Sequence, residues 1–422
     1  MSEETPDGDV RPLLILVSPM GRTTRGYLLS SVAQDHRIWL FSDTEPTWER
    51  PHIVGHTVVD TLDTDLMAQA AAHVPADAIL CWDETRILPA ARLAREVGLP
   101  GMDPEVVGVC RDKHLTRIAC AAGEVPQAAS CAVATQAEAA AVAARFGYPV
   151  VIKPRALVGS FGAALVRSPE ELAAAFPHTH DMAMPEVRER FERPVLVEEF
   201  LDGPEISVDA LCHGGEVTPL FLARKELGFP PYFEEVGHFV DAADPLLSDD
   251  RLRTCLTAAH RAVGLTAAWT HTEWRLTATG PRLVEINARS GGDLIPYLGL
   301  LATGVDAGLV AADLALGRAP DIRVRSSGVA AVRFLYPPQD MVVGDVRVDP
   351  ARLPALVDRA EVLAQPGQHL RLPPRAHVSG RHAFVVATGA TVEECRQVLD
   401  EAAAAVVLEP ADEVIEGAVA RR

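Results

Sequence analysis

Residues 269–287 limit the fold of this chain more narrowly than any other stretch, because they read as one β-hairpin with acids on both strands. The segment 269–276 is rich in Trp and Thr, and the segment 281–286 is apolar. Between them, residues 278–280 end in a glycine and suit a three-residue hairpin loop with that glycine in the left-handed position. We therefore predict two antiparallel strands here.

The register of this hairpin predicts a metal site. A three-residue loop pairs Thr277 with Pro281, which brings Glu273 opposite Glu285, and the period of two puts Asn287 on the face of Glu285. Facing like charges destabilise a sheet unless a cation neutralises them. A few hard oxygen ligands, with room left for water and phosphate, are what Mg²⁺ prefers. The alternative is a solvated sheet face with two unrelated acids.

The start of the chain alternates strand and helix patterns. Residues 13–17 read as a buried strand, 24–33 as a helix and 38–41 as a second strand, and a further strand at 76–82 precedes a helix at 88–97. This is the opening of a doubly wound, Rossmann-like layer. No glycine fingerprint follows the first strand, so it does not indicate a dinucleotide site.

A lysine and a glycine-rich loop follow one apolar strand. Residues 150–152 are apolar, Lys153 ends the strand, and the loop after it contains Gly159, Ser160, Phe161 and Gly162. Such a loop can lay backbone N–H groups, with one fixed cation, on a polyphosphate. The alternative is an ordinary hairpin turn beside an exposed lysine.

Another apolar strand, 195–197, delivers Glu198, Glu199 and Phe200, and Glu205 follows shortly after. A carboxylate at the end of a buried strand, next to exposed backbone, can read an adenine edge, and Glu205 could hold ribose hydroxyls. The alternative is that these glutamates face solvent, as most do.

Composition excludes several classes of protein. The formal net charge of −19 and pI near 5.2 disfavour nucleic acid as a partner, because phosphates need a basic patch. No apolar run reaches the roughly 18 residues of a membrane span. Residues 1–10 are polar and acidic, unlike a secretion signal, so we expect a cytoplasmic protein. The 7 cysteines lack metal-ligand spacing and predict neither disulfides nor zinc.

The order of the motifs carries a resemblance. The chain resembles the ATP-grasp superfamily over about residues 80–320, closest to the carboxylate–amine ligase branch that contains the L-amino acid (dipeptide) ligases. The resemblance rests on segments that occur in the family's order: 111–113, 151–154, 198–205, Glu273 and 285–289.

The resemblance implies an α/β (α+β) chain with the ATP-grasp fold. It divides the chain into a Rossmann-like N-terminal domain, a nucleotide lid subdomain, a central metal and catalytic subdomain, and a small C-terminal α+β subdomain. The corresponding bounds are 1–108, 109–204, 205–326 and 327–422.

The resemblance also implies cofactor sites. Lys113 and Lys153 would bind ATP phosphates, Lys153 also reaching the adenine side. The remaining implied ligands are Glu198, Glu199 and Phe200 for adenine, Glu205 for ribose, and Glu273, Glu285 and Asn287 for two Mg²⁺ ions, which Mn²⁺ can replace.

Family chemistry implies an acyl phosphate that an amine then attacks, with ADP and phosphate released. Arg289 lies two residues after Asn287 and is the candidate for stabilising the oxyanion of the second step. Its alternative is a structural ion pair with Glu273 or Glu285. Lys225, which precedes a long connection at 230–245, and His238, which lies within it, would contact the acyl phosphate or the substrate. A solvated lysine and a structural histidine are their alternatives, and His271 reads as a packed histidine.

Three functions follow. The first is an amide- or peptide-forming ligase with small-molecule carboxylate and amine substrates, amino-acid-like in kind, for which a homodimer is a common assembly. The second is a carboxylating enzyme that uses bicarbonate, as biotin carboxylases and purine-pathway enzymes do. The third is a non-catalytic nucleotide-binding protein.

Overall fold

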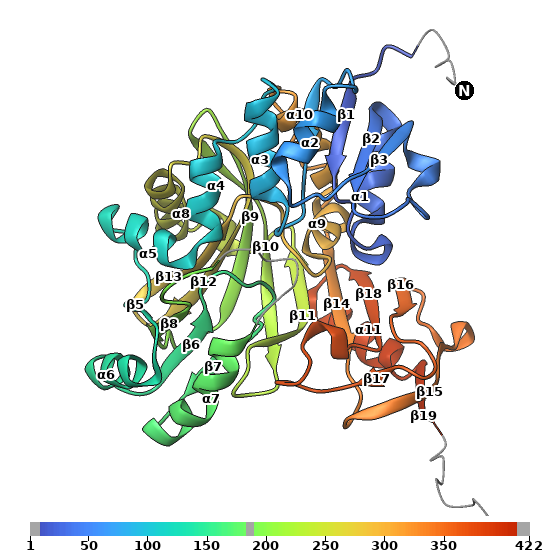
Figure 1. Ribbon diagram of the computed structural model, residues 1–422. Coiled ribbons are helices and arrows are strands. Elements are labelled where there is room, and N and C mark those ends of the chain that lie inside the picture. Colours follow the sequence, from blue (N-terminus) through green and yellow to red (C-terminus); the bar gives the residue numbers. More distant parts are fainter. Residues whose placement is uncertain (1–8, 183–189, 412–422) are drawn as a thin grey trace, which may run out of the picture.

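The N-terminal part of the chain is a four-stranded parallel sheet with helices around it (Figure 1). The computed structural model describes residues 9–182 and 190–411. The first elements are β1 (Leu13–Val17), α1 (Arg22–Asp35), β2 (Arg37–Ser42), β3 (Gly55–Val58), α2 (Thr64–Ala71), β4 (Ala78–Leu80) and α3 (Ile87–Glu96). The strands lie in the order β3-β2-β1-β4 and run parallel. The predicted Rossmann-like layer is thus present, although residues 1–8 of its segment lie outside the described part.

Two helices, α4 (Pro104–Arg111) and α5 (Lys113–Ala122), connect this sheet to the next. Asp112 separates them, and its carboxylate accepts the backbone N–H groups of His114 and Leu115 at the start of α5. An Asp in this N-cap position satisfies donors that have no partner within the helix. The cap fixes Lys113 as the first residue of α5.

A small antiparallel sheet with two helices follows, which we call the lid sheet. Its elements are β5 (Ser130–Val133), α6 (Gln136–Phe146), β6 (Val150–Pro154), β7 (Ala164–Val166), α7 (Pro169–Asp181) and β8 (Val195–Glu199), with strand order β5-β8-β6-β7. It has a core of its own, in which α6 and α7 pack on one face of the strands. The lid sheet therefore has a hydrophobic core separate from that of the central sheet. Residues 183–189, within its segment, are not described.

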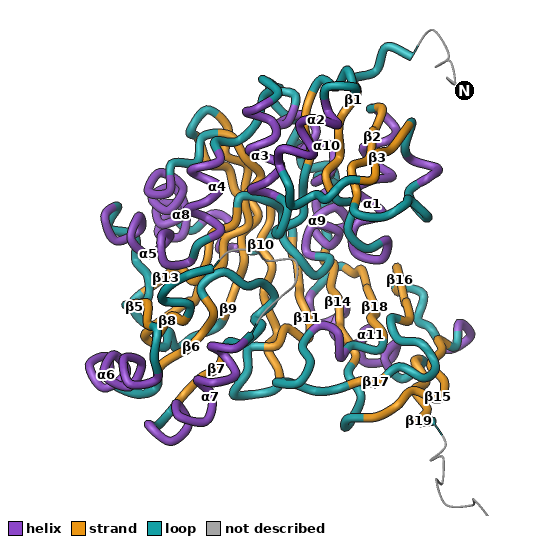
Figure 2. Tube along the Cα trace, viewed as in Figure 1, coloured by secondary structure: helices purple, strands orange, loops and turns teal. Residues whose placement is uncertain are grey.

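The largest layer is one antiparallel eight-stranded sheet, the central sheet (Figure 2). Its elements and those around it are β9 (Glu205–His213), β10 (Glu216–Gly228), β11 (Glu234–Asp241), α8 (Asp250–Val263), β12 (Ala267–Thr277), β13 (Gly280–Asn287), α9 (Ile295–Thr303), α10 (Ala307–Ala315), β14 (Val329–Leu335), β16 (Val357–Val362), β18 (Ala383–Gly389) and α11 (Val392–Ala403). The strand order is β13-β12-β9-β10-β11-β14-β18-β16.

Helices bury both faces of the central sheet. One core joins α8, α4 and α5 to β9, β12 and β13. On the opposite face, α9 and α10 join the sheet to β1, β2, β4 and α1 of the N-terminal layer. The N-terminal and central layers therefore share a hydrophobic core, which holds the carboxyl end of β4 close to the end of β13.

The strands of the C-terminal segment are divided between the central sheet and a small sheet of their own. β14, β18 and β16 continue the central sheet, and α11 packs on β14 and β18. Only β15 (Met341–Val348), β17 (His369–Leu370) and β19 (Val406–Pro410) build a further, three-stranded sheet. The predicted boundary at residue 327 thus precedes strands that extend the central sheet. The domain bounds stay a prediction, and residues 412–422 lie outside the described part.

The predicted register at the hairpin loop is wrong. Thr277 faces Gly280 rather than Pro281, so the loop has two residues instead of three. Gly280 has a φ of +115°, and a Cβ there would lie 2.5 Å from the guanidinium of Arg251. The positive φ favours glycine, as predicted, but Gly280 is the first residue of β13 rather than a loop residue, and the turn is tighter than expected.

A β-bulge restores the predicted meeting of the two acids. The register shifts by one residue beyond Glu273, and Val284 on β13 is the extra residue. Glu273 therefore faces Glu285, and His271 faces Asn287. The shorter loop and the bulge each shift the register by one residue in opposite directions, so the two shifts cancel at Glu273 and Glu285.

The long connection predicted at 230–245 is wrong in its middle. β11 occupies Glu234–Asp241 and pairs with both β10 and β14, so it is an interior strand of the central sheet. Its polar residues, Glu234, Glu235 and His238, hid the strand pattern. Lys225 on β10 pairs directly with His238 on β11.

Among the described residues, no single helix is both long and apolar enough to cross a membrane. α9 and α10 pass that test only as a pair, with a bend of 104° between them. Both helices contribute to the core shared by the N-terminal and central layers.

Candidate active site

A cavity of about 200 Å³ lies where the lid sheet faces the central sheet. Every residue predicted for the site lines it except Gly162, Lys225 and His238. Gly162 lies in the loop beside the lining residues, with a φ of +73°, and a Cβ there would lie 2.9 Å from Pro154. The fold thus brings residues from 113 to 289 to one place, which the sequence order alone could not show.

The lid side of the cavity contains a buried triad of charges. Glu198 accepts two hydrogen bonds from Arg117, at 2.8 and 3.0 Å, and pairs with Lys153 at 2.7 Å. Burial raises the pKa of Glu198, but the charges of Arg117 and Lys153 outweigh it and hold that pKa well below its usual range. A contact between the Glu198 carboxylate and adenine therefore has to compete with both cations. The alternative of an exposed lysine at 153 is wrong, because Lys153 is buried.

The other two predicted nucleotide-binding acids also face arginines. Glu199 pairs with Arg282 at 3.0 Å, and Glu205 pairs with Arg275 at 2.8 Å and with Lys225 at 3.2 Å. Burial raises the pKa of Glu205. Their roles toward adenine and ribose stay predictions.

The loop after Lys153 is fastened at its base. Asp112 accepts two hydrogen bonds from Arg155, at 2.7 and 2.6 Å, and the Lys113 ammonium donates to the carbonyl of Leu157 at 2.6 Å. Gly159 and Ser160 then adopt φ values of +59° and +57°. A non-glycine residue in that region is uncommon and marks a backbone that its surroundings hold in place.

The acids of the hairpin are each neutralised by a lysine. Lys225 lies 2.6 Å from Glu273, and Lys113 lies 3.3 Å from Glu285. The two carboxylate side chains are only 18% and 19% exposed, so the alternative of a solvated sheet face is wrong. Asn287 is buried, and its Oδ1 atom has no hydrogen-bond partner among the described residues. A buried acceptor left unpaired is costly, so this oxygen is available to a ligand or to a water molecule.

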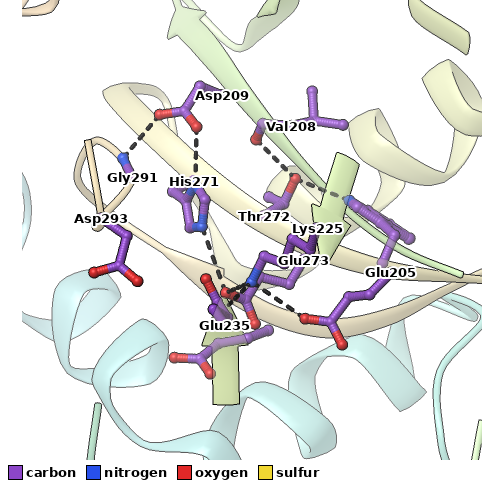
Figure 3. A network of polar contacts seen from close by, with 12 residues as sticks. Glu205, Val208, Asp209, Lys225, Glu235, His271, Thr272, Glu273, Gly291 and Asp293 are labelled. Atoms are coloured by element: carbon purple, nitrogen blue, oxygen red, sulfur yellow. Dashed lines mark hydrogen bonds and ion pairs between the residues drawn. The ribbon is translucent and has the colours of Figure 1, made fainter. Parts of the chain in front are cut away.

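Lys225 lies in a cage of three carboxylates, all of which line the cavity (Figure 3). Its side chain is fully buried and contacts Glu205 at 3.2 Å, Glu235 at 2.7 Å and Glu273 at 2.6 Å. Burial lowers the pKa of Lys225, but the three acids outweigh it and raise that pKa well above its usual range. The alternative of a solvated lysine is wrong. The lysine is positioned to hold Glu273 and Glu205 in place.

Asp209 anchors a second set of contacts that the sequence analysis missed (Figure 3). This fully buried carboxylate accepts from Trp269 Nε1 at 2.7 Å and from the backbone N–H of Gly291 at 2.8 Å, and it pairs with His271 Nδ1 at 2.8 Å. His271 Nε2 lies 3.5 Å from Glu273. A signal was present in the sequence, because Asp209 shares a strand face with Glu205, one of the predicted site residues.

Arg289 is held by a partner far away in sequence. Its Nε donates to Glu84 at 2.5 Å, and the predicted alternative, a pair with Glu273 or Glu285, is wrong. Glu84, just after β4, also accepts from Arg111 at 2.7 Å. Burial raises the pKa of Glu84, but Arg289 and Arg111 outweigh it and lower the pKa to about 2. The N-terminal layer therefore sets the position of Arg289.

The C-terminal segment completes the cavity wall with Arg381, which the sequence analysis also missed. Arg381 donates to both oxygens of Asp293, at 2.9 and 2.7 Å, and to the carbonyl of Glu235 at 2.8 Å. His238, fully buried behind this wall, lies 3.2 Å from Glu235 and 3.8 Å from Asp293. His238 is thus a buried partner of the wall acids, which favours a structural role over contact with substrate.

Comparisons with known proteins agree with this architecture. Residues 146–296 match the model of the ATP-grasp domain. The chain is 34% identical over 255 residues to the uncharacterised protein y4rH of Sinorhizobium fredii, covering 59% of this chain and 51% of that protein. It is 28% identical over 255 residues to alanine–anticapsin ligase of Bacillus subtilis, covering 55% and 52%. The chain thus spans about half the length of these curated relatives.

The fold likeness extends over nearly the whole chain. The crystal structure of L-amino acid ligase from Bacillus licheniformis superposes with a TM-score of 0.80 at 20% identity, covering 95% of this chain and 99% of that one. The ATP-grasp fold predicted from the sequence is confirmed. The chain has the ATP-grasp fold, and residues 146–296 match the ATP-grasp domain. The chain is similar to carboxylate–amine ligases, among them the alanine–anticapsin and L-amino acid ligases.

Proposed function

We propose that this protein is an ATP-dependent carboxylate–amine ligase, which forms an amide or peptide bond through an acyl phosphate and acts on amino-acid-like substrates. One observation carries the proposal. A single cavity gathers two phosphate-binding candidates, Lys113 and Lys153, with three hard oxygen ligands and Arg289. Phosphoryl transfer depends mainly on positioning and on neutralisation of charge, which are what these groups provide.

The residues present fit Mg²⁺. Glu273 and Glu285 face each other across the hairpin, and the Asn287 Oδ1 atom is buried without a partner. All three offer the hard oxygen atoms that Mg²⁺ selects. We propose that they hold two ions, which Mn²⁺ can replace, and bound Mg²⁺ would neutralise phosphate charge.

The lid sheet would hold the nucleotide. Lys113 and Lys153 would contact phosphate oxygens, and the loop with Gly159, Ser160, Phe161 and Gly162 would offer backbone N–H groups. The backbone at Phe200, with Glu198 and Glu199 close by, would meet adenine, and Glu205 would meet ribose. Because Glu198 already holds Lys153, it would act mainly by positioning that lysine.

The reaction has two steps. A carboxylate oxygen of the acid attacks the γ-phosphorus of ATP, and the bond from that phosphorus to the β,γ-bridging oxygen breaks to release ADP. The amine nitrogen then attacks the acyl carbon, loses a proton, and phosphate leaves. We propose that Arg289 donates to the oxyanion of this second step. Removing one such donor typically slows a reaction by a factor of about 100 to 1,000.

A coupled assay of ADP release tests this proposal. ADP is expected only when Mg²⁺, an acid and an amine are all supplied from a panel, with the amide detected by mass spectrometry. Release of ADP with bicarbonate alone would favour the carboxylating alternative. Binding of ATP without turnover of any pair would favour the non-catalytic alternative. A homodimer and a cytoplasmic location also stay predictions, and light scattering tests the first of them.

A further inference from the structure

A second cavity, of about 110 Å³, adjoins the catalytic one. It lies between the N-terminal layer and the central sheet, with walls from β4, α3, the start of β12 and the end of α10. Most of its lining is apolar, including Ala94, Met102, Ala268 and Ala315. Arg289 lines both cavities, so the two meet at this side chain.

The polar groups in this lining are engaged elsewhere, with two exceptions. The indole N–H of Trp82 donates to the carbonyl of Pro19, that of Trp269 donates to Asp209, and the Cys81 thiol faces the carbonyl of Asp83.

The exceptions are Arg289, which also lines the catalytic cavity, and the neighbouring Ser290. Arg289 donates through Nε and Nη1 to Glu84 and to a carbonyl, while its Nη2 atom and the Ser290 hydroxyl have no partner among the described residues. The second cavity therefore has an apolar body and one end with free N–H and O–H donors.

We propose that the second cavity binds the acid substrate, with its carboxylate on Arg289 and Ser290 and an apolar chain in the cavity. This inference rests on the proposed ligase function and adds the class of acid. A pocket that is mostly apolar, with a few convergent donors at one end, matches a carboxylic acid with an aliphatic chain. The carboxylate then lies where Arg289 opens into the catalytic cavity, next to the phosphate-binding residues.

The volume limits the chain length. One water occupies about 30 Å³ of liquid, and a methylene group is of similar size, so the cavity has room for roughly three or four methylene groups. Binding should tighten by about fourfold for each methylene added, until the cavity is full.

Calorimetry with two homologous series tests this inference: straight-chain acids of two to six carbons, and unbranched 2-amino acids of the same lengths. Each acid is titrated into the full-length protein saturated with Mg²⁺ and a non-hydrolysable ATP analogue. Affinity is expected to rise along at least one series and then level off. Affinity that is independent of chain length in both series, or no binding of any acid, overturns the inference.

Two variants change the cavity in opposite directions. Ala315→Leu on α10 should fill it and weaken binding of the longest acid by about tenfold or more, with little effect on the shortest. Met102→Ala should enlarge it and move the optimum to longer acids, and it serves if the first variant does not fold. Ala141→Leu, at an exposed position of α6, is the matched control and should change neither.

The same proteins separate the two proposals. Chain-length selectivity that is the same in both cavity variants as in the native protein overturns the second cavity as the binding site, even if ADP is released with every acid. Selectivity that follows the cavity variants supports the inference, and ADP release then decides the ligase reaction separately. A merely structural packing defect would change the thermal stability of Ala315→Leu but not its selectivity.

Discussion

Replacing Glu84 by Gln should lower the free energy of unfolding at neutral pH, and the lowered pKa of Glu84 sets the size of this change. Glu84 is 8% exposed and lies between Arg111 and Arg289. These cations lower its pKa from an ordinary value of 4.5 to about 2. A shift of one pKa unit corresponds to about 1.36 kcal/mol. The ionised carboxylate therefore stabilises the folded state by about 3 kcal/mol at pH 7.

The pH dependence of this effect has a definite sign. Because the folded-state pKa lies below the unfolded one, the stabilisation is complete above about pH 4.5 and is lost as the pH falls toward 2. Glu84→Gln has no carboxylate to titrate there. The difference in unfolding free energy between native protein and variant should therefore be about 3 kcal/mol at pH 7 and should shrink steadily below pH 4.5.

Urea unfolding at a series of pH values measures this difference, and subtraction cancels the other carboxylates. Glu105→Gln is the matched control, since Glu105 also accepts two hydrogen bonds from an arginine but lies on the surface. That variant should change stability little. Equal stabilities of native protein and Glu84→Gln at pH 7, or a difference that does not change between pH 7 and pH 3, would refute the reasoning.

Three further variants test the site. Asn287→Leu should leave the melting temperature unchanged or raise it, because Oδ1 has no protein partner, while Mg²⁺-dependent binding of ATP, followed by calorimetry, should weaken at least tenfold. Lys153→Met should weaken ATP binding while circular dichroism shows an intact fold, since Glu198 keeps its two hydrogen bonds from Arg117; unchanged affinity would remove Lys153 from the phosphate site. Arg25→Met should raise the melting temperature, because two buried donors of Arg25 are unpaired among the described residues. The same variant should lower kcat, because Arg25 donates to the carbonyl of Gly291 beside the cavity. A lower melting temperature would contradict this account.

Local pattern was enough to predict much of this protein. The alternation of strands and helices at the start and the apolar strand that carries Lys153 follow from periods of two and 3.6 residues, whereas Glu273 and Glu285 face each other because the shorter turn and the β-bulge cancel. The order of the motifs carried the resemblance from which the ATP-grasp fold was expected. The local elements depend on neighbours in sequence, which is why the chain itself determined them.

Tertiary structure decided the rest. Arg289 is held by Glu84, which is 205 residues away, and the wall of the cavity depends on Arg381, which pairs with Asp293. β11 is a strand because β10 and β14 flank it, although its own residues are too polar to show the pattern. Ion pairs of this kind form only after packing has removed water from both partners and brought them together, and no local periodicity encodes which distant charge will be there.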